Sequence, residues 1–184
     1  MPMKLTIPEN DDLWDPENSR FISIKEQTLI LEHSLISLAK WEKITKKSFL
    51  YSAEKEDISS DEWILYIKCM TINNVNDYVY NCITPEMFKQ VFDYINDPMT
   101  ATTINDRRPK TNRGRKEIIT AEILYYQMIY YGIPVEFEKW HLNTLTTLIG
   151  VFAIKGGNPE KMSSSEAGAY QRAINESRKL KGRR

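Results

Sequence analysis

Long hydrophobic runs and clustered cysteines are both missing from this sequence of 184 residues. The longest apolar runs fall far short of the roughly 20 residues that cross a bilayer, and the first residues lack the apolar stretch of a signal peptide. The two cysteines, Cys69 and Cys82, lie in apolar contexts without a partner cluster, which favours buried free thiols and leaves a disulfide open. We therefore expect a protein that stays in the cytoplasm where it is made and has no membrane partner.

Signatures of catalysis are also missing. His33 and His141 belong to no metal-binding motif such as HExxH. Glu136 and Glu138 are two residues apart, so on a helix they point to different faces and make no acid–base pair. The serines at 163–165 lack the surroundings of a nucleophile, and no glycine-rich phosphate loop occurs. The sequence thus predicts a protein that is not an enzyme, binds no cofactor or metal, and uses both histidines structurally.

Charge is balanced overall but unevenly distributed, since 25 Lys and Arg residues oppose 25 Asp and Glu residues. Residues 1–106 hold 10 of the basic and 18 of the acidic residues, so residues 107–184 hold the other 15 and 7. This asymmetry is consistent with nucleic-acid binding, with head-to-tail self-association and with a charged protein partner. Residues 107–116 contain six basic residues and no aromatic residue to stack on bases. A solvated loop is the favoured interpretation there, followed by contact with an acidic protein surface and then by nucleic acid.

Apolar periodicity predicts a mainly α fold: one compact helical domain, residues 1–158, and a basic C-terminal helix or flexible tail, residues 159–184. A short N-terminal β-hairpin is expected at about residues 3–24, with residues 4–8 and 20–24 as its strands and an acidic, turn-rich loop between them. Five to six helices form the rest, two of them marked by serine or Thr84 at the N-cap. The expected helices cover residues 25–44, 61–71, 84–96, 117–131, 134–149 and 165–180, with a loop at 46–59 and a short turn at 78–82.

Residues 117–149 have the clearest apolar pattern, interrupted only where Gly132 should close one helix and Pro134 should open the next. This pair of helices is expected to form the core. The first helix is apolar nearly all round, as in a helix buried in its own fold or against a partner, and tyrosine suits an interface. A core role alone and a core role combined with an interface both stay open. The candidate partner-binding residues are Tyr126, Tyr130, Tyr131 and Trp140, together with Arg107, Arg108, Arg113, Arg115 and Lys116.

Several segments, in order along residues 4–163, resemble one known family. They are residues 25–42 (KEQTLILEHSLISLAKWE), 66–72 (YIKCMTI), 97–102 (DPMTAT), 117–130, 133–145 and 161–163. These segments resemble the small phage proteins, encoded among siphophage tail genes, that are described as tail assembly chaperones. The chain departs from the family at Gln127, where relatives tend to have Trp, at Thr144, where they tend to have a basic residue, and at the less basic residues 163–165. The departures weaken a residue-by-residue transfer of any interface.

The resemblance implies a non-catalytic factor in the host cytoplasm. Such a factor binds the tape measure protein, keeps it soluble, helps to recruit tail tube subunits, and is then displaced and absent from the mature virion. Because a chaperone must release its client, several weak sites with charge steering are expected, and the uneven charge would let neighbouring copies associate along the client. Two alternatives stay open. One is a virion structural component of the neck, head–tail connector or tail-terminator type, and the other is a nucleic-acid-binding factor that uses residues 107–116 and 172–184.

Overall fold

The computed structural model describes residues 2–15, 19–102 and 118–156. The chain divides into two compact units, Met1–Gly150 and Val151–Arg184, and the fold below is that of the first unit. The predicted basic segment at 107–116 and the predicted helix at 165–180 lie outside the described residues. The predicted division of the chain at 158/159 also falls there and stays a prediction.

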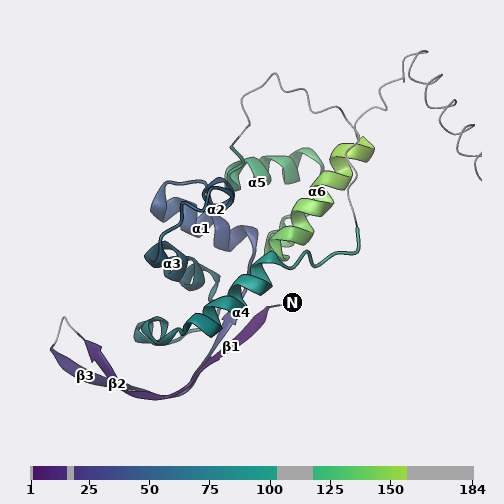
Figure 1. The fold of residues 1–184 in the computed structure, drawn as a ribbon. Coiled ribbons are helices and arrows are strands. Elements are labelled where there is room, and N and C mark those ends of the chain that lie inside the picture. Colours follow the sequence, from purple (N-terminus) through teal and green to yellow (C-terminus); the bar gives the residue numbers. More distant parts are fainter. Residues whose placement is uncertain (1, 16–18, 103–117, 157–184) are drawn as a thin grey trace, which may run out of the picture. The chain divides into compact units, whose positions relative to one another are not determined.

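The N-terminal part forms four strands rather than two, drawn in purple to blue in Figure 1: β1 (Met3–Ile7), β2 (Asn10–Asp15), β3 (Arg20–Ile24) and β4 (Gln27–Leu31). β1 pairs with β4 and β2 pairs with β3, in both cases antiparallel. Each pair is a two-stranded sheet, and the β2–β3 hairpin is nested between β1 and β4 in the chain. The prediction that residues 4–8 and 20–24 are the strands of one hairpin is therefore wrong.

The prediction of a mainly α fold with a single short hairpin is accordingly corrected, because the described residues contain two antiparallel sheets beside the helices. The difference lies at residues 27–31, where Leu31, Leu35 and Leu38 recur at helical spacing and predict a helix. Alternation decides the structure there instead. Leu29 and Leu31 are fully buried whereas Thr28 is exposed, the pattern of a half-buried strand. The helix begins only after Ser34, which caps α1 (Leu35–Thr45).

Two helices begin where their capping residues predicted. α3 (Ser60–Met70) starts at Ser59, whose hydroxyl accepts a hydrogen bond from the Glu62 N–H while the Glu62 carboxylate accepts one from the Ser59 N–H. α4 (Pro85–Asn96) has Thr84 as its N-cap and proline in its first turn. Between them, the predicted short turn is the 3-10 helix η1 (Asp77–Cys82). The helix predictions at 61–71 and 84–96 are thus confirmed.

The second half of the predicted helix pair is wrong in its boundaries. α5 (Ala121–Tyr130) is followed by Gly132 with φ of 65°, as the glycine predicted. Pro134 then opens only a 3-10 helix, η2 (Val135–Lys139), and α6 (Leu142–Gly156) begins after an extended Trp140. The acids and aromatic residues of residues 135–140 give no continuous helical stripe, so the long helix starts eight residues late. The predicted loop at 46–59 also contains a short helix, α2 (Phe49–Glu54).

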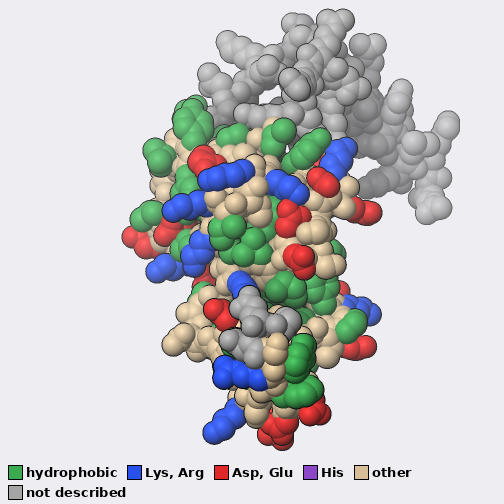
Figure 2. All heavy atoms as spheres, turned by 90° about the vertical axis from the view of Figure 1, so that its left-hand side faces the viewer, with side chains coloured by type: hydrophobic (Ala, Val, Ile, Leu, Met, Phe, Trp, Pro, Cys, Tyr) green, Lys and Arg blue, Asp and Glu red, His purple; other side chains and the backbone are tan. Residues whose placement is uncertain are grey.

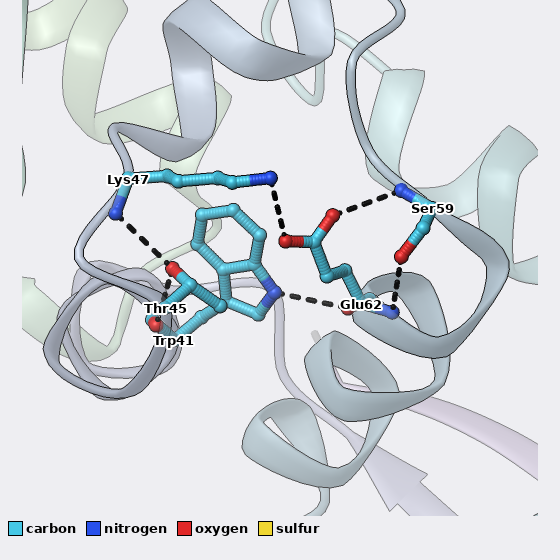
Figure 3. Close-up of polar contacts among 5 residues, drawn as sticks. All are labelled: Trp41, Thr45, Lys47, Ser59 and Glu62. Atoms are coloured by element: carbon cyan, nitrogen blue, oxygen red, sulfur yellow. Dashed lines mark hydrogen bonds and ion pairs between the residues drawn. The ribbon is translucent and has the colours of Figure 1, made fainter.

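The segment 117–149 is part of the core, as predicted, but it shares the core with α1, α3 and the strands β1 and β4. Trp41 of α1 and Tyr66 of α3 are fully buried, and the ring of Phe49 stacks on that of Tyr66 at 4.0 Å between centroids. The indole N–H of Trp41 donates to the Glu62 carbonyl oxygen at 2.9 Å, and Lys47 Nζ lies 2.8 Å from Glu62 Oε1 (Figure 3). The segment 117–149 contributes Ala121, Leu124, Met128, Ile133, Leu142, Leu145 and Ile149 to this core.

Candidate functional site

The position of α5 is set by a buried carboxylate on another helix. Glu42, near the end of α1, is buried, and its Oε2 accepts a hydrogen bond from the N–H of Ala121, the first residue of α5, at 2.7 Å. Its Oε1 accepts one from the N–H of Phe49, the first residue of α2, at 2.9 Å. One carboxylate therefore satisfies free N–H groups at the N-termini of two helices, where negative charge is favoured. Burial raises the pKa of Glu42, while these two hydrogen bonds act in the opposite direction.

A second hydrogen bond holds the same junction. Ser48, the N-cap of α2, donates from its hydroxyl to the carbonyl oxygen of Ile119 at 2.7 Å. Thr120, the N-cap of α5, makes no capping hydrogen bond with its own side chain. The start of α5 is thus capped by Glu42 of α1, and the residue pair Ser48 and Ile119 ties the segment before α5 to the start of α2. Sequence reasoning did not assign this role to Glu42, because nothing local links residue 42 with residue 121.

The side of α5 that faces away from the core is aromatic and apolar. Tyr126 is 65% exposed, Ile129 is 80% exposed and Tyr130 is 69% exposed. These residues are spaced at i, i+3 and i+4, so they lie on one side of the helix, and the rings of Tyr126 and Tyr130 stack at 6.1 Å. We call Tyr126, Ile129 and Tyr130 the α5 outer face. Of the two open interpretations of this helix, the structure favours a core role on one side combined with exposed aromatic residues on the other.

The remaining tyrosines of α5 connect it to the following segment. The Tyr125 hydroxyl donates to Glu138 Oε2 at 2.9 Å and so joins α5 to η2. Burial raises the pKa of Tyr125 to about 12, and the Glu138 carboxylate acts in the same direction. Tyr131 is half-buried, and its ring meets the edge of Tyr130 at 5.0 Å. Tyr131, a predicted partner-binding residue, therefore packs against Tyr130 and adds little exposed surface of its own.

Trp140 was predicted to bind a partner together with the tyrosines, but it has other neighbours. Its indole stacks on Phe137 at 3.9 Å, and it is partly exposed beside a cavity of about 470 Å³. The walls of this cavity come from α4, η2 and α6 and from residues next to β1, β4, α4 and η2. The cavity is lined by Pro2, Glu32, Tyr94, Met99, Lys139, Trp140, His141 and Thr144.

The two histidines meet in the interior, with ring centroids 4.9 Å apart. His33 Nδ1 lies 2.6 Å from the Tyr66 hydroxyl. His141 Nε2 lies 3.0 Å from the Tyr94 carbonyl oxygen, and its Nδ1 accepts a hydrogen bond from the Asn143 N–H at 3.3 Å. Burial lowers the pKa of His33 to about 3, and the neighbouring His141 lowers it further. Burial also lowers the pKa of His141, against the effect of its bond to Tyr94. Burial thus disfavours the charged form of both rings, and His33 Nδ1 and both nitrogens of His141 are engaged with groups of the fold.

The five predicted partner-binding residues Arg107, Arg108, Arg113, Arg115 and Lys116 lie outside the described residues, so the structure does not relate them to the α5 outer face. On the face of the molecule drawn in Figure 2, basic and acidic side chains are interspersed and hydrophobic side chains gather in separate groups. That face carries no extended surface of one charge.

A second exposed aromatic pair was missed by the sequence interpretation. Trp14 of β2 and Phe21 of β3 are paired across the hairpin, with ring centroids 5.1 Å apart, and are 50% and 66% exposed. Residues 9–19 were interpreted as an acidic loop because Asp, Asn and Pro dominate them. The aromatic residues Trp14 and Phe21, of a kind enriched in strands, were the available signal.

In the described residues, no helix has the length and apolar character of a bilayer-spanning helix, and no three His, Cys, Asp or Glu side chains gather as metal ligands would. Comparison of this chain with protein-family models, with curated proteins and with solved structures finds no match.

Proposed function

We propose that this chain is a tail assembly chaperone, a non-catalytic factor of the host cytoplasm that binds the phage tape measure protein and helps to recruit tail tube subunits. The α5 outer face is the proposed client-binding surface. The proposal rests on the sequence resemblance, and the single structural observation that supports it is the exposure of Tyr126, Ile129 and Tyr130.

The chemistry of this face suits a long helical client. An apolar stripe on one helix can pack against the apolar stripe of another, with side chains at i, i+3 and i+4 as anchors. Tyrosine offers a large ring and a hydroxyl that stays hydrogen-bonded in either the free or the bound state. The capping of α5 by Glu42 holds the face in place before a client arrives, which reduces the entropy lost on binding.

The small size of the α5 outer face suits a factor that must release its client. Three exposed side chains make a small contact, which favours weak binding at each copy. Many copies along one client would then bind strongly together and still dissociate one at a time. A single tight site would oppose the displacement that assembly requires.

The test is co-expression of the chain with the neighbouring tail proteins, followed by capture of this chain and quantification of the tape measure protein. The double variant Tyr126→Ala/Tyr130→Ala should capture at least about tenfold less client, because buried tyrosines contribute strongly to interfaces. Tyr51→Ala/Ile72→Ala is the matched control, since both side chains are exposed on other elements, and it should capture the wild-type amount. Equal capture by all three proteins would rule out the α5 outer face as the client surface.

A virion structural component is the second candidate, and the β2–β3 hairpin is the observation that favours it. This two-stranded sheet has no further strand on either side in the described residues, so it could extend the sheet of a neighbouring subunit in a ring. Mass spectrometry of purified particles separates the two candidates. A structural component is present at a fixed copy number, whereas a chaperone is absent.

A further inference from the structure

The β2–β3 hairpin has one face that packs on the rest of the fold. Asp15 is buried, and its Oδ2 accepts a hydrogen bond from the Tyr78 hydroxyl of η1 at 3.2 Å. Nearer the base of the hairpin, Asn10 Nδ2 donates to Cys82 Sγ at 3.7 Å. Because side chains alternate along a strand, residues 13 and 15 share this inward face. The hairpin is therefore held against η1 and presents its other face outward.

The outward face carries Trp14 and Phe21, which pack edge to face across the two strands. Exposed acids, Glu9, Asp11 and Asp12, lie at or next to the start of β2. In the described part of the chain, no Lys or Arg side chain forms an ion pair with these three acids. We call Trp14 and Phe21, with the acids beside them, the hairpin face. Asp11 accepts a hydrogen bond from the Ser23 hydroxyl. An aromatic pair beside acids that have no basic partner among the described residues matches a segment that is both basic and apolar.

The chain itself contains such a segment. Residues 170–184 hold six Lys or Arg residues and one Glu, with Tyr170, Ile174 and Leu180 among them. Arginine or lysine can lie over the face of an aromatic ring while its charge meets a nearby carboxylate. The aliphatic and aromatic side chains of the segment can cover the exposed rings of the hairpin face.

We propose that the hairpin face of one copy binds residues 170–184 of a second copy, so that the chain assembles head to tail. Each copy carries both halves of this contact, and a contact between two different surfaces leaves one of each free at the ends of the assembly. Association therefore propagates instead of stopping at a symmetric dimer. The contact is electrostatic in part, so added salt weakens it. This inference specifies residues for self-association and does not depend on the identity of any client.

Sedimentation velocity of the full-length chain over a range of concentrations is the first test. The wild-type protein should sediment as a mixture whose mean mass rises with concentration and falls with added salt. Trp14→Ala/Phe21→Ala and the charge reversal Asp11→Lys/Asp12→Lys should each sediment as monomers at concentrations where the wild type associates. A wild-type chain that is monomeric at every concentration and salt level contradicts the proposal.

Reversing the charges on both sides of the contact tests whether residues 170–184 are the segment that binds the hairpin face. Arg183→Glu/Arg184→Glu should also abolish association, and its combination with Asp11→Lys/Asp12→Lys should restore it. Asp93→Lys/Glu136→Lys is the matched control, because it reverses two exposed acids outside the hairpin face and should associate as the wild type does. Failure of the combined variant to associate, while circular dichroism shows it folded, would overturn the pairing of the hairpin face with residues 170–184.

A photocrosslinker distinguishes a second copy from the same copy. Benzoylphenylalanine in place of Phe21, in a mixture of nitrogen-14 and nitrogen-15 chains, should give crosslinks to residues 170–184 with mixed isotope labels. Crosslinks within one chain, to another hairpin or to residues 107–116 would each overturn the assignment. The variant Tyr126→Ala/Tyr130→Ala should associate normally, so loss of client capture and loss of self-association are separate results.

Discussion

At the scale of single residues, the buried polar groups explain more of the structure than of the function. The sequence predicts structural roles for His33 and His141, and each is buried and hydrogen-bonded to groups of the fold. Their lowered pKa values follow from burial, which disfavours the charged imidazolium. A perturbed pKa marks a functional group only where a substrate can reach it. His33 is enclosed in the core, whereas His141 also lines the cavity beside Trp140.

The lowered pKa of His33 predicts sensitivity to acid. Its folded pKa of about 3 lies below the usual 6.5, so the unfolded chain binds a proton that the folded chain excludes. The stability contributed by neutral His33 is complete above pH 6.5 and is lost as the pH falls towards 3, with a slope approaching about 1.4 kcal/mol per pH unit.

Urea denaturation at pH 6.5, 5.8 and 5.0 measures this slope above the range where most carboxylates titrate. His33→Gln should have a shallower slope than the wild type, even though it is less stable at pH 7. His141 contacts His33 and titrates in the same direction, so His141→Gln is a second comparison. Identical slopes in the wild type and His33→Gln would contradict the assignment.

At the scale of elements, the sequence predicted structure well where the deciding contacts are local. The ends of α3 and α4 depend on caps within a few residues, and both helices begin where Ser59 and Thr84 indicate. Gly132 likewise closes α5 through its own positive φ. In each case, the residues that fix the end of the helix lie within a few positions of that end.

The predicted secondary structure is wrong where contacts between residues far apart in the sequence determine it. Residues 27–31 have leucines at both helical and alternating positions, and pairing of β4 with β1, 20 or more residues away, selects the strand. Asn73 completes the selection, since its side chain accepts from the Ile30 N–H and donates to the Thr28 carbonyl oxygen, both at 2.8 Å. The candidate site was predicted in part. Tyrosine spacing indicated the α5 outer face, but only the tertiary fold separates Trp140 from it.

Replacing Glu42 should destabilise the fold, because its carboxylate joins α1 to the N-termini of α2 and α5. Glu42→Ala removes the acceptor of two buried N–H groups and should lower the free energy of unfolding by about 2–4 kcal/mol. Glu42→Gln keeps one carbonyl oxygen and should lose less. Glu136→Ala, at an exposed position, is the control and should stay within about 0.5 kcal/mol of the wild type. Chemical denaturation measures all three, and a loss equal to that of the control would refute the capping role.

At the scale of the whole molecule, two exposed aromatic surfaces have separate proposed partners. Glu42 caps α5, and the α5 outer face is the proposed binding surface for a helical client. The β2–β3 hairpin packs on η1, and the hairpin face is the proposed binding surface for a second copy of the chain. Monomeric proteins expose scattered apolar residues without functional meaning, but each surface here includes a pair of rings that pack on each other. Chains joined through the hairpin face would present a row of α5 outer faces, which matches the multivalent binding expected of a client that is long and repetitive.

Hydrogen–deuterium exchange of the chain, with and without the tape measure protein, tests the central proposal most directly. Amide exchange reports protection element by element. Binding through the α5 outer face should slow exchange in α5 (Ala121–Tyr130), and Tyr126→Ala/Tyr130→Ala should remove that protection while its unbound exchange matches the wild type. Protection of other elements with α5 unchanged, or no protection at saturating client, would contradict the account.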